Sequence, residues 1–193
     1  SCDNGVVELA HNGNLRNYRI DDYCTYKLSV EFPEDGVNID TSTIDSFFND
    51  IMLDDKKMVD YLQRFLGYSI TGHTIEQKFV VFWGELGGNG KSVLIELLRH
   101  VLEEGKYYAT LSGDSILKNK KSSPGAATPH LLPLFGSRIA IVDESDKEVK
   151  LNEGMIKRVT GNKTYTVRPL FKEEFTFENC AQPILITNFR PNI

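Results

Sequence analysis

Glycines, a lysine and a serine are grouped at residues 84–92, where the chain reads Gly-Glu-Leu-Gly-Gly-Asn-Gly-Lys-Ser. The backbone amides of a glycine-rich loop, followed by the N-terminus of a helix, form a nest for an anion such as phosphate. Lys91 can reach the β- and γ-phosphates of a nucleotide as a point charge, and the hydroxyl of Ser92 can ligate a Mg²⁺ that bridges them. The predicted site for ATP with Mg²⁺ comprises Gly87, Gly88, Asn89, Gly90, Lys91, Ser92 and Val93.

The glycine spacing departs from the strict phosphate-loop pattern, which requires a glycine where this chain has Glu85. Either the loop is one residue longer and starts at Gly84, or Gly87 makes the turn and Glu85 points outward, because a carboxylate facing a triphosphate would be repelled. The dinucleotide-binding pattern G-x-G-x-x-G is disfavoured, since Val93 occupies the place of its third glycine. The remaining alternative is a glycine-rich turn that merely precedes a helix.

Further polar positions follow apolar runs and supply the other groups that ATP hydrolysis requires. Asp143 and Glu144 come after residues 138–142, and Asn188 comes after residues 184–187. Asp143 is predicted to hold the Mg²⁺, and Glu144 to orient and deprotonate the attacking water. Asn188 is predicted to hydrogen-bond the γ-phosphate and that water. Taken singly, an acid pair is a common surface feature and an asparagine after a strand is a common turn residue.

The elements around these positions alternate between strand and helix. Short apolar, β-branched runs predict strands at 79–83, 138–142 and 184–187, and helical spacing predicts a helix at 91–102. That helix is expected to bury Leu94, Leu97, Leu98 and Val101. Strands that are apolar throughout are typical of a parallel sheet covered on both faces. The predicted class is α/β, with a mainly parallel sheet.

Residues 1–77 are predicted to form an accessory region ahead of an ATPase core at residues 78–193. Strand-like pieces at 6–9, 18–20 and 26–32 indicate a small β-meander. A helix is expected from Ser42, and a second after Asp55 that ends at Gly67. The second helix carries a stripe of apolar side chains, namely Met58, Tyr61, Leu62, Phe65 and Leu66. Aromatic residues at this spacing could line a ligand pocket, but core packing is the commoner cause.

Composition and charge restrict the classes of function that remain. The net charge of -5 counts against a general electrostatic grip on nucleic acid, so any DNA contact must be local. Lys118, Lys120 and Lys121 form one basic cluster, which is more often a solvated loop. Neither the cysteines nor the histidines have the spacing of a metal site. No apolar run approaches the roughly 18 residues that span a bilayer, and no secretion signal is present. The absence of an initiator Met indicates a piece of a longer chain.

The ordered motifs resemble those of the superfamily 3 helicases, in the primase-helicase branch of poxviruses, other large DNA viruses, phages and plasmids. Besides the positions above, the resemblance extends to residues 4–7, 62–68, 151–162, 170–172 and 187–193, and thus covers nearly the whole chain. It implies an AAA+-like P-loop NTPase core, in which Lys91, Ser92, Asp143, Glu144 and Asn188 fill the motif positions. It also implies a hexameric ring that hydrolyses ATP and moves 3′ to 5′ on single-stranded DNA, with a primase or polymerase as a further partner. Host cytoplasm or a viral replication site is the expected location.

In the family, a hairpin after the Thr-Gly motif projects into the ring and touches DNA. By resemblance this hairpin runs over residues 164–177, with Lys163, Arg168 and Lys172 contacting phosphates and Phe171 near the tip. Charges that are merely solvated are the alternative. The turn before the hairpin departs from the family, since Asn162 replaces a second glycine and Lys163 replaces an acid.

The family's arginine finger, with the last strand and helices of the core, would lie beyond Ile193. An arginine finger is worth about 10³-fold or more in rate, so this chain alone is expected to bind nucleotide weakly, form rings poorly and hydrolyse ATP slowly. Two other functions remain open. A P-loop phosphotransferase of another class would require a lid, and no lid-like cluster of arginines is found. A nucleotide-binding module could assemble a replication complex without translocation. DNA-stimulated hydrolysis distinguishes the helicase from both.

Overall fold

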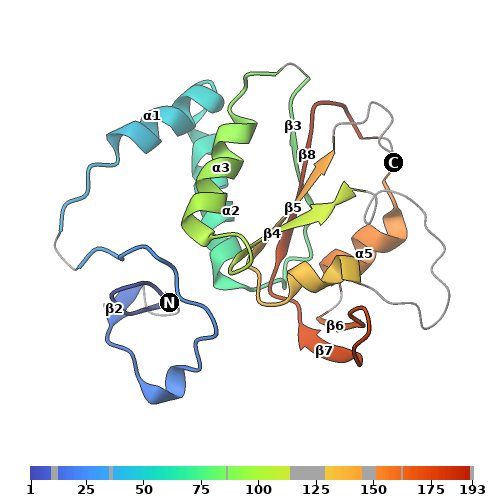
Figure 1. Ribbon diagram of the computed structural model, residues 1–193. Helices are drawn as coiled ribbons and strands as arrows, with labels where there is room; N and C mark the ends of the chain where they lie inside the picture. Colours follow the sequence, from blue (N-terminus) through green and yellow to red (C-terminus); the bar gives the residue numbers. More distant parts are fainter. Residues whose placement is uncertain are drawn as a thin grey trace.

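A four-stranded parallel sheet forms the centre of the chain, in the order β3-β8-β5-β4. The computed structural model describes residues 1–9, 13–34, 37–85, 87–113, 129–144, 151–161 and 163–191. The strands are β3 (Val80–Trp83), β4 (Tyr108–Ser112), β5 (Ile139–Glu144) and β8 (Gln182–Thr187) (Figure 1). The predicted α/β class with a parallel sheet is therefore confirmed. The sequence patterns do not predict β4, because Thr110 and Ser112 interrupt its apolar residues.

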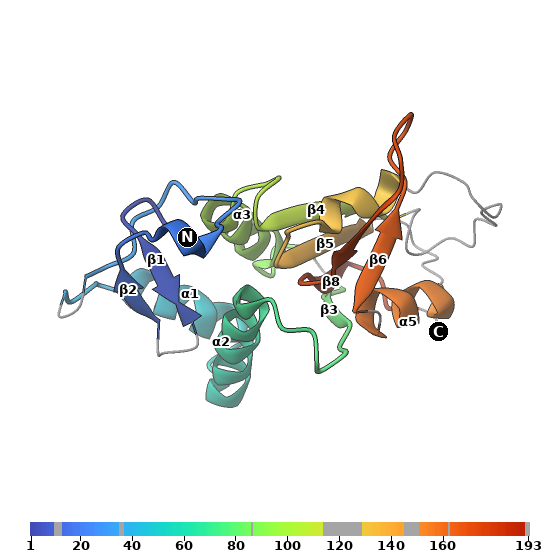
Figure 2. The ribbon, with the colours of Figure 1, turned by 90° about the horizontal axis from the view of Figure 1, so that it is seen from below.

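Helices cover one face of the sheet, and a helix with a hairpin covers the other (Figures 1 and 2). Ile139 and Ile141 of β5 pack toward α2 (Lys56–Thr71) and α3 (Lys91–Leu102). Ala140 and Val142, which alternate with them, pack toward α5 (Glu153–Gly161), the 3-10 helix η3 (Pro129–Leu134), and the hairpin of β6 (Thr164–Val167) and β7 (Phe175–Glu178). A strand buried on both faces has no polar face, which explains its continuous apolar sequence.

The helix α3 has the predicted bounds, but its buried face differs from the expected one. Leu94 and Leu102 are buried and Leu98 is half-buried, whereas Leu97 and Val101 are 36% and 39% exposed. The prediction that Leu97 and Val101 are buried was wrong. Side chains four residues apart lie above one another on a helix, so Leu94, Leu98 and Leu102 form the inward row. Leu102 packs with the sheet, Leu94 packs with Val59 and Leu62 of α2, and Leu98 contacts both groups.

The helix α2 begins as predicted and continues beyond its predicted end. The carboxylate of Asp55 accepts hydrogen bonds from the backbone N–H groups of Lys57 and Met58, at 3.0 and 3.3 Å, and so caps the N-terminus. Gly67 lies inside the helix and does not end it, because Ser69 in the next turn is buried against the core. Gly72, with φ +77°, is the residue that ends α2.

In the described part of the first forty residues, one small hairpin forms instead of a meander. β1 (Val6–Glu8) pairs antiparallel with β2 (Asn14–Arg16), and Ile20–Asp22 forms a short 3-10 helix, so the strand predicted at residues 18–20 was wrong. Residues 26–32 lie beside the N-terminus but make only isolated bonds to it, such as Asp3 N–H to the Val30 carbonyl at 2.8 Å. No ladder forms between these described residues, so the strand expected at 26–32 was also wrong.

Several contacts fasten this N-terminal segment to the sheet. The ring of Tyr26 meets that of Tyr107 edge to face, with centroids 5.9 Å apart, and the Tyr107 hydroxyl donates to the Tyr26 carbonyl at 3.1 Å. Lys106 Nζ donates to the Lys27 carbonyl at 2.6 Å. The helix α1 (Ser42–Ile51) then leads from this segment to α2. Within the described ranges, no helix has both the length and the apolar composition for a membrane crossing.

Candidate functional site

Three of the predicted motifs lie at the same end of the sheet. Trp83 of β3 is in register with Thr187 of β8, and Thr187 is in register with Glu144 of β5. Because neighbouring strands lie about 4.8 Å apart, the residues that follow these strands emerge within roughly 10 Å of one another. The glycine-rich loop, residues 84–90, follows β3 and crosses to α3, and Asn188 follows β8 (Figure 1). The fold therefore brings together motifs that are about 50 to 100 residues apart in sequence.

The glycine-rich loop is fixed at both ends by backbone hydrogen bonds. Gly84 N–H donates to the Thr187 carbonyl at 3.3 Å, and Leu94 N–H donates to the Gly90 carbonyl at 2.9 Å as the first bond of α3. Gly88 and Gly90 have φ of +78° and +79°, a conformation that L side chains rarely adopt. Gly87 is not in this region, so Gly88 rather than Gly87 makes the turn. Glu85 is exposed, in agreement with the prediction that it points outward.

Gly84 is a constrained residue of the loop that the spacing argument does not assign to the site. A Cβ at position 84 would lie 1.8 Å from Asn89 Nδ2 and 3.0 Å from Lys91 Nζ. Lys91 Nζ donates to the Gly84 carbonyl at 3.2 Å and to Asn89 Oδ1 at 2.7 Å. The missing side chain of Gly84 thus makes the space for the Asn89 amide, and the Lys91 ammonium rests beside that amide. The only sequence signal is a glycine one place ahead of the expected position.

Burial lowers the pKa of Lys91, because the loop removes part of the water around its ammonium group. A protonated ammonium that is partly desolvated gains more from a nearby anion than one in bulk water does. This environment suits the binding of a phosphate.

The other predicted residues are accessible at this end of the sheet. Ser92 and Val93 are exposed in the first turn of α3, and Asp143 and Asn188 are exposed at the ends of β5 and β8. Glu144 is the last residue of β5, and its side chain lies outside the described part of the structure.

The buried Thr187 holds the turn that presents Asn188. Its hydroxyl accepts a hydrogen bond from Phe189 N–H and donates one to the Phe189 carbonyl, both at 3.0 Å. Thr187 is 2% exposed, so this turn is set from inside the core. The sequence pattern marks Thr187 only as the end of a strand.

A cavity of about 620 Å³ adjoins the loop. It lies between the helices α1 and α2 and the strand β3, and Asn89 and Lys91 form its polar end. The helix α1 touches the loop directly, since a Cβ at Gly90 would lie 2.2 Å from Ile51 Cγ2. The helices α1 and α2 therefore form one wall beside the glycine-rich loop and Lys91.

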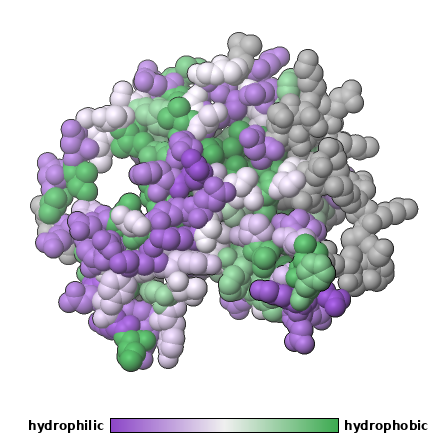
Figure 3. Space-filling model, viewed as in Figure 1, coloured by the Kyte–Doolittle hydropathy of each residue, from purple (hydrophilic) through white to green (hydrophobic). Residues whose placement is uncertain are grey.

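The hairpin of β6 and β7 stands at the end of the molecule opposite to the glycine-rich loop (Figure 1), and its tip is clear of the body (Figure 2). Its base is anchored by the buried residues Tyr165, Val167 and Phe177, and the Tyr165 hydroxyl donates to the Arg158 carbonyl at 2.8 Å. Phe171 at the tip is fully exposed, with φ +59°. Hydrophobic and strongly hydrophilic side chains lie side by side there (Figure 3).

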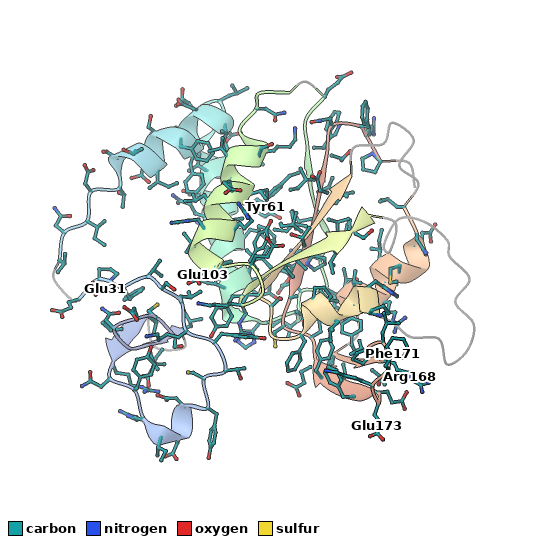
Figure 4. The ribbon with its side chains drawn as sticks, viewed as in Figure 1. Glu31, Tyr61, Glu103, Arg168, Phe171 and Glu173 are labelled. Atoms are coloured by element: carbon teal, nitrogen blue, oxygen red, sulfur yellow. The ribbon has the colours of Figure 1, made fainter. Side chains whose placement is uncertain are left out.

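The hairpin places two of its three predicted DNA-contacting residues together. Arg168 and Lys172 are exposed and flank the tip residue Phe171, and Figure 4 shows Arg168 and Phe171 close to each other. Lys163 is exposed at the foot of the hairpin, where its carbonyl accepts from Asn179 N–H at 2.7 Å. Lys163 is therefore separated from the tip by the length of β6. The basic cluster at Lys118, Lys120 and Lys121 lies outside the described residues.

Comparison with known proteins gives two family matches. The family of unknown function DUF5906 matches residues 82–193, and the family described as D5 N terminal like matches residues 1–53. A putative helicase of Acanthamoeba polyphaga mimivirus, L207/L206, is 34% identical over 99% of this chain. Putative helicase 022R of Frog virus 3 (isolate Goorha) is 28% identical over 77% of this chain. The chain spans 19% and 15% of the length of these two relatives.

Solved structures show the same fold at low sequence identity. The A form apo structure of the NrS-1 C-terminal region matches 80% of this chain and 34% of its own, with a TM-score of 0.60 and 18% identity. A second apo structure of that region has a TM-score of 0.57 and 16% identity, and covers 75% of this chain and 33% of that one. The chain therefore belongs to the DUF5906 family, with a segment similar to the D5 N-terminal-like family ahead of it, and it is similar to viral proteins that are named as putative helicases.

Proposed function

We propose that this chain is the ATP-binding part of a replicative DNA helicase of a virus, phage or plasmid, which moves 3′ to 5′ on single-stranded DNA. The observation that carries the proposal is the register of Trp83, Thr187 and Glu144, because the loop, the acidic pair and Asn188 stand at or just beyond the ends of these three strands, on the same edge of the sheet. The viral relatives named as putative helicases support it. By analogy with superfamily 3, the working form is an AAA+-like hexamer at a viral replication site or in host cytoplasm, with a primase or polymerase as partner.

The loop and the start of α3 would hold the nucleotide. Backbone amides of residues 87–93 face the phosphates, and the ammonium of Lys91 exchanges its bonds to Gly84 and Asn89 for bonds to the β- and γ-phosphates. Ser92 and Asp143 fit a Mg²⁺ ion, because both present exposed oxygen atoms at the same end of the sheet. When bound, Mg²⁺ neutralises part of the phosphate charge.

Hydrolysis would use the groups that follow β5 and β8. Glu144 orients the attacking water and accepts its proton, and the amide of Asn188 donates a hydrogen bond to the γ-phosphate and positions that water. Lys91 stabilises the charge that grows on the phosphoryl group in transit. Thr187 contributes indirectly, because it fixes the turn from which Asn188 projects.

DNA would be held at the hairpin tip. Arg168 and Lys172 can pair with backbone phosphates on either side of Phe171, whose exposed ring can stack on a base. Lys163 would contact DNA only if the strand follows the hairpin to its foot. The overall net charge of -5 favours a local contact of this kind over a general electrostatic grip on DNA.

The deciding experiment measures the ATPase rate with and without single-stranded DNA, for a chain that continues past Ile193. Stimulation by DNA, with loss of turnover in Lys91→Ala and Glu144→Gln, is the expected result. Lys157→Ala is a matched control, because Lys157 is an exposed lysine whose ion pair with Glu153 stays within α5. ATP binding without any response to DNA would refute translocation and leave a nucleotide-switched assembly module. Acceptor-dependent phosphoryl transfer would instead indicate a phosphotransferase.

A further inference from the structure

The two strands of the β6–β7 hairpin lead to side chains of opposite charge. Lys163 precedes β6 and Arg168 follows it, and no acidic residue lies between them. Glu173 and Glu174 precede β7 and Glu178 ends it, with no basic residue between them. All five of these residues are exposed. The β6 side of the hairpin is therefore basic, and the β7 side is acidic.

Strand pairing keeps these two sides of the hairpin apart. The ladder between β6 and β7 extends to the pair of Val167 and Phe175, just below the tip. Arg168 follows the first strand of this pair and lies close to Phe171, whereas Glu173 precedes the second strand and points away from them (Figure 4). A ligand on the β6 side of the tip can therefore contact Arg168 without approaching Glu173.

The tip and the basic side together suit a single strand of nucleic acid. Phe171 and Lys172 belong to the turn at the tip, and the Phe171 ring is fully exposed. An unpaired strand is flexible, so it can stack a base on this ring while its phosphates meet Lys172 and Arg168. Its backbone can then continue along the β6 side, away from the glutamates.

A duplex meets both sides of the hairpin at once. A two-stranded ribbon fits the major groove of DNA, which is about 12 Å wide, and then has a phosphate backbone on each side. On this hairpin one backbone would meet Arg168, but the other would meet Glu173 and Glu174, where like charges repel. The bases of a duplex are also paired, so none is free to stack on Phe171. The acidic side therefore disfavours a duplex far more than a single strand.

We propose that Glu173 and Glu174 are specificity-determining residues, which exclude duplex DNA from the hairpin tip by repelling its second backbone. The inference rests on the proposed function in one respect, namely that the tip binds DNA. It adds a repulsive element to the attractive contacts of Arg168, Lys172 and Phe171. Discrimination between two related ligands commonly uses both kinds of element.

The experiment compares two glutamates of the same strand. Glu173→Gln removes a negative charge beside the tip, and Glu178→Gln is the matched control at the foot of the hairpin. The two positions lie roughly 16 Å apart along an extended strand, beyond the Debye length of about 10 Å at 0.1 M salt. Fluorescence anisotropy at that salt concentration gives the affinities of this chain for a labelled single-stranded oligonucleotide and for its duplex.

Glu173→Gln should raise the affinity for the duplex about fivefold and change the affinity for the single strand by less than about twofold. Glu178→Gln should change neither affinity by more than about twofold. Equal increases for both ligands in Glu173→Gln would overturn the inference, because the charge would then act on DNA in general. So would an unchanged affinity for the duplex, or equal effects of Glu173→Gln and Glu178→Gln.

Phe171→Ala distinguishes a failure of this inference from a failure of the proposed function. If Phe171→Ala weakens binding of the single strand but Glu173→Gln does not favour the duplex, only the specificity inference is wrong. If Phe171→Ala leaves the affinity for the single strand intact, the tip is not the DNA site. The proposed DNA contact then fails first, and the specificity inference fails with it.

Discussion

Ile51 of α1 lies so close to Gly90 that a Cβ at position 90 would be 2.2 Å from Ile51 Cγ2. Gly90 is also the N-cap of α3, with φ +79°. Gly90 therefore adopts the left-handed backbone conformation of the loop, and its lack of a side chain also leaves room for Ile51 of α1. Any movement of α1 relative to the core must act on the loop at this point.

Substitution of the loop glycines should produce a graded loss of stability. Gly90→Ala should lower the free energy of unfolding by about 2–4 kcal/mol, because it combines left-handed strain with the clash against Ile51. Gly88→Ala has the strain but open space around it, so about 1 kcal/mol is expected. Gly87→Ala has neither and should stay within about 0.5 kcal/mol of wild type. Urea unfolding of the three variants measures the series.

A double substitution checks the cause. Ile51→Ala removes the atoms that a Cβ at position 90 would meet, so its loss of stability and that of Gly90→Ala should sum to more than the loss in the double variant. Simple additivity would show that the two residues do not interact as described.

Gly84→Ala should weaken nucleotide binding clearly while it lowers the stability of the fold only slightly. The new Cβ would displace Asn89 and Lys91, but both obstacles are ends of flexible side chains, so stability should fall by less than about 1 kcal/mol. Nucleotide affinity should nevertheless fall about tenfold, because Lys91 is moved from its position and a charge-assisted hydrogen bond is worth that much. Thermal shift with and without Mg-ATP reports both quantities. Gly87→Ala serves as the control, and an equal affinity in the two variants would contradict the role given to Gly84.

Acid should weaken the N-terminal hairpin through Asp22. The Arg16 guanidinium, which donates to this carboxylate, lowers the pKa of Asp22 from 3.8 to about 2, and the backbone N–H of Arg19 contributes. Because the folded pKa lies below the unfolded one, the stabilisation is complete above pH 3.8 and disappears as the pH falls toward 2. The Tm difference between wild type and Asp22→Asn should therefore be constant near neutral pH and shrink below about pH 4.

Asp21→Asn is the control for this titration, since the neighbouring Asp21 is exposed and does not make the bonds to Arg16 and Arg19. A Tm difference for Asp22→Asn that persists to about pH 2 would show that the ion pair is not what stabilises the turn.

Substitutions at the hairpin tip should affect DNA and leave the fold intact. Phe171→Ala removes a fully exposed ring, so no change in Tm is expected, whereas binding to a single-stranded oligonucleotide should weaken by about 1–3 kcal/mol. Arg168→Ala with Lys172→Ala should reduce the slope of log affinity against log salt by about 1.4, or about 0.7 for each phosphate that is no longer neutralised. Fluorescence anisotropy at several salt concentrations measures both effects. Lys163→Ala should lower the slope less, because Lys163 lies at the foot of the hairpin.

Local sequence patterns predict the strands and helices whose conformation does not depend on contacts with distant parts of the chain. The apolar runs of β3, β5 and β8 and the helical spacing of α3 are sufficient to locate them, and the order of strand, loop and helix locates the glycine-rich loop. Where tertiary contacts decide the length of a helix or the pairing of a strand, the predictions fail. α2 continues through Gly67 because the turns beyond it pack on the core, and residues 26–32 do not pair because only single bonds reach them.

The sequence predicts the motifs of the candidate site, but it does not predict how these residues are arranged in space. Spacing identifies Lys91, Asp143 and Asn188, but the register that brings the ends of their strands together depends on pairings between residues far apart in sequence. Thr187 is missed for the same reason, and Gly84 is given only as an alternative start of the loop. Each owes its role to neighbours on other elements or to a turn set inside the core. The division of the chain at residues 77 and 78 and the chemical roles of the site residues stay predictions.

The position of β8 has a consequence for how the chain acquires its structure during synthesis. Of the four strands in the described sheet, β8 comes last along the chain, and it lies between β3 and β5, which do not pair with each other. Ile184 and Leu185 of β8 are fully buried in the folded protein. Before these residues leave the ribosome, β3 has no partner strand in the described sheet and one edge of β5 is uncovered. Such edges invite aggregation until they are paired. These four strands should therefore form one sheet only after β8 has emerged, and a ribosome stalled ahead of β8 would display a substrate for chaperones.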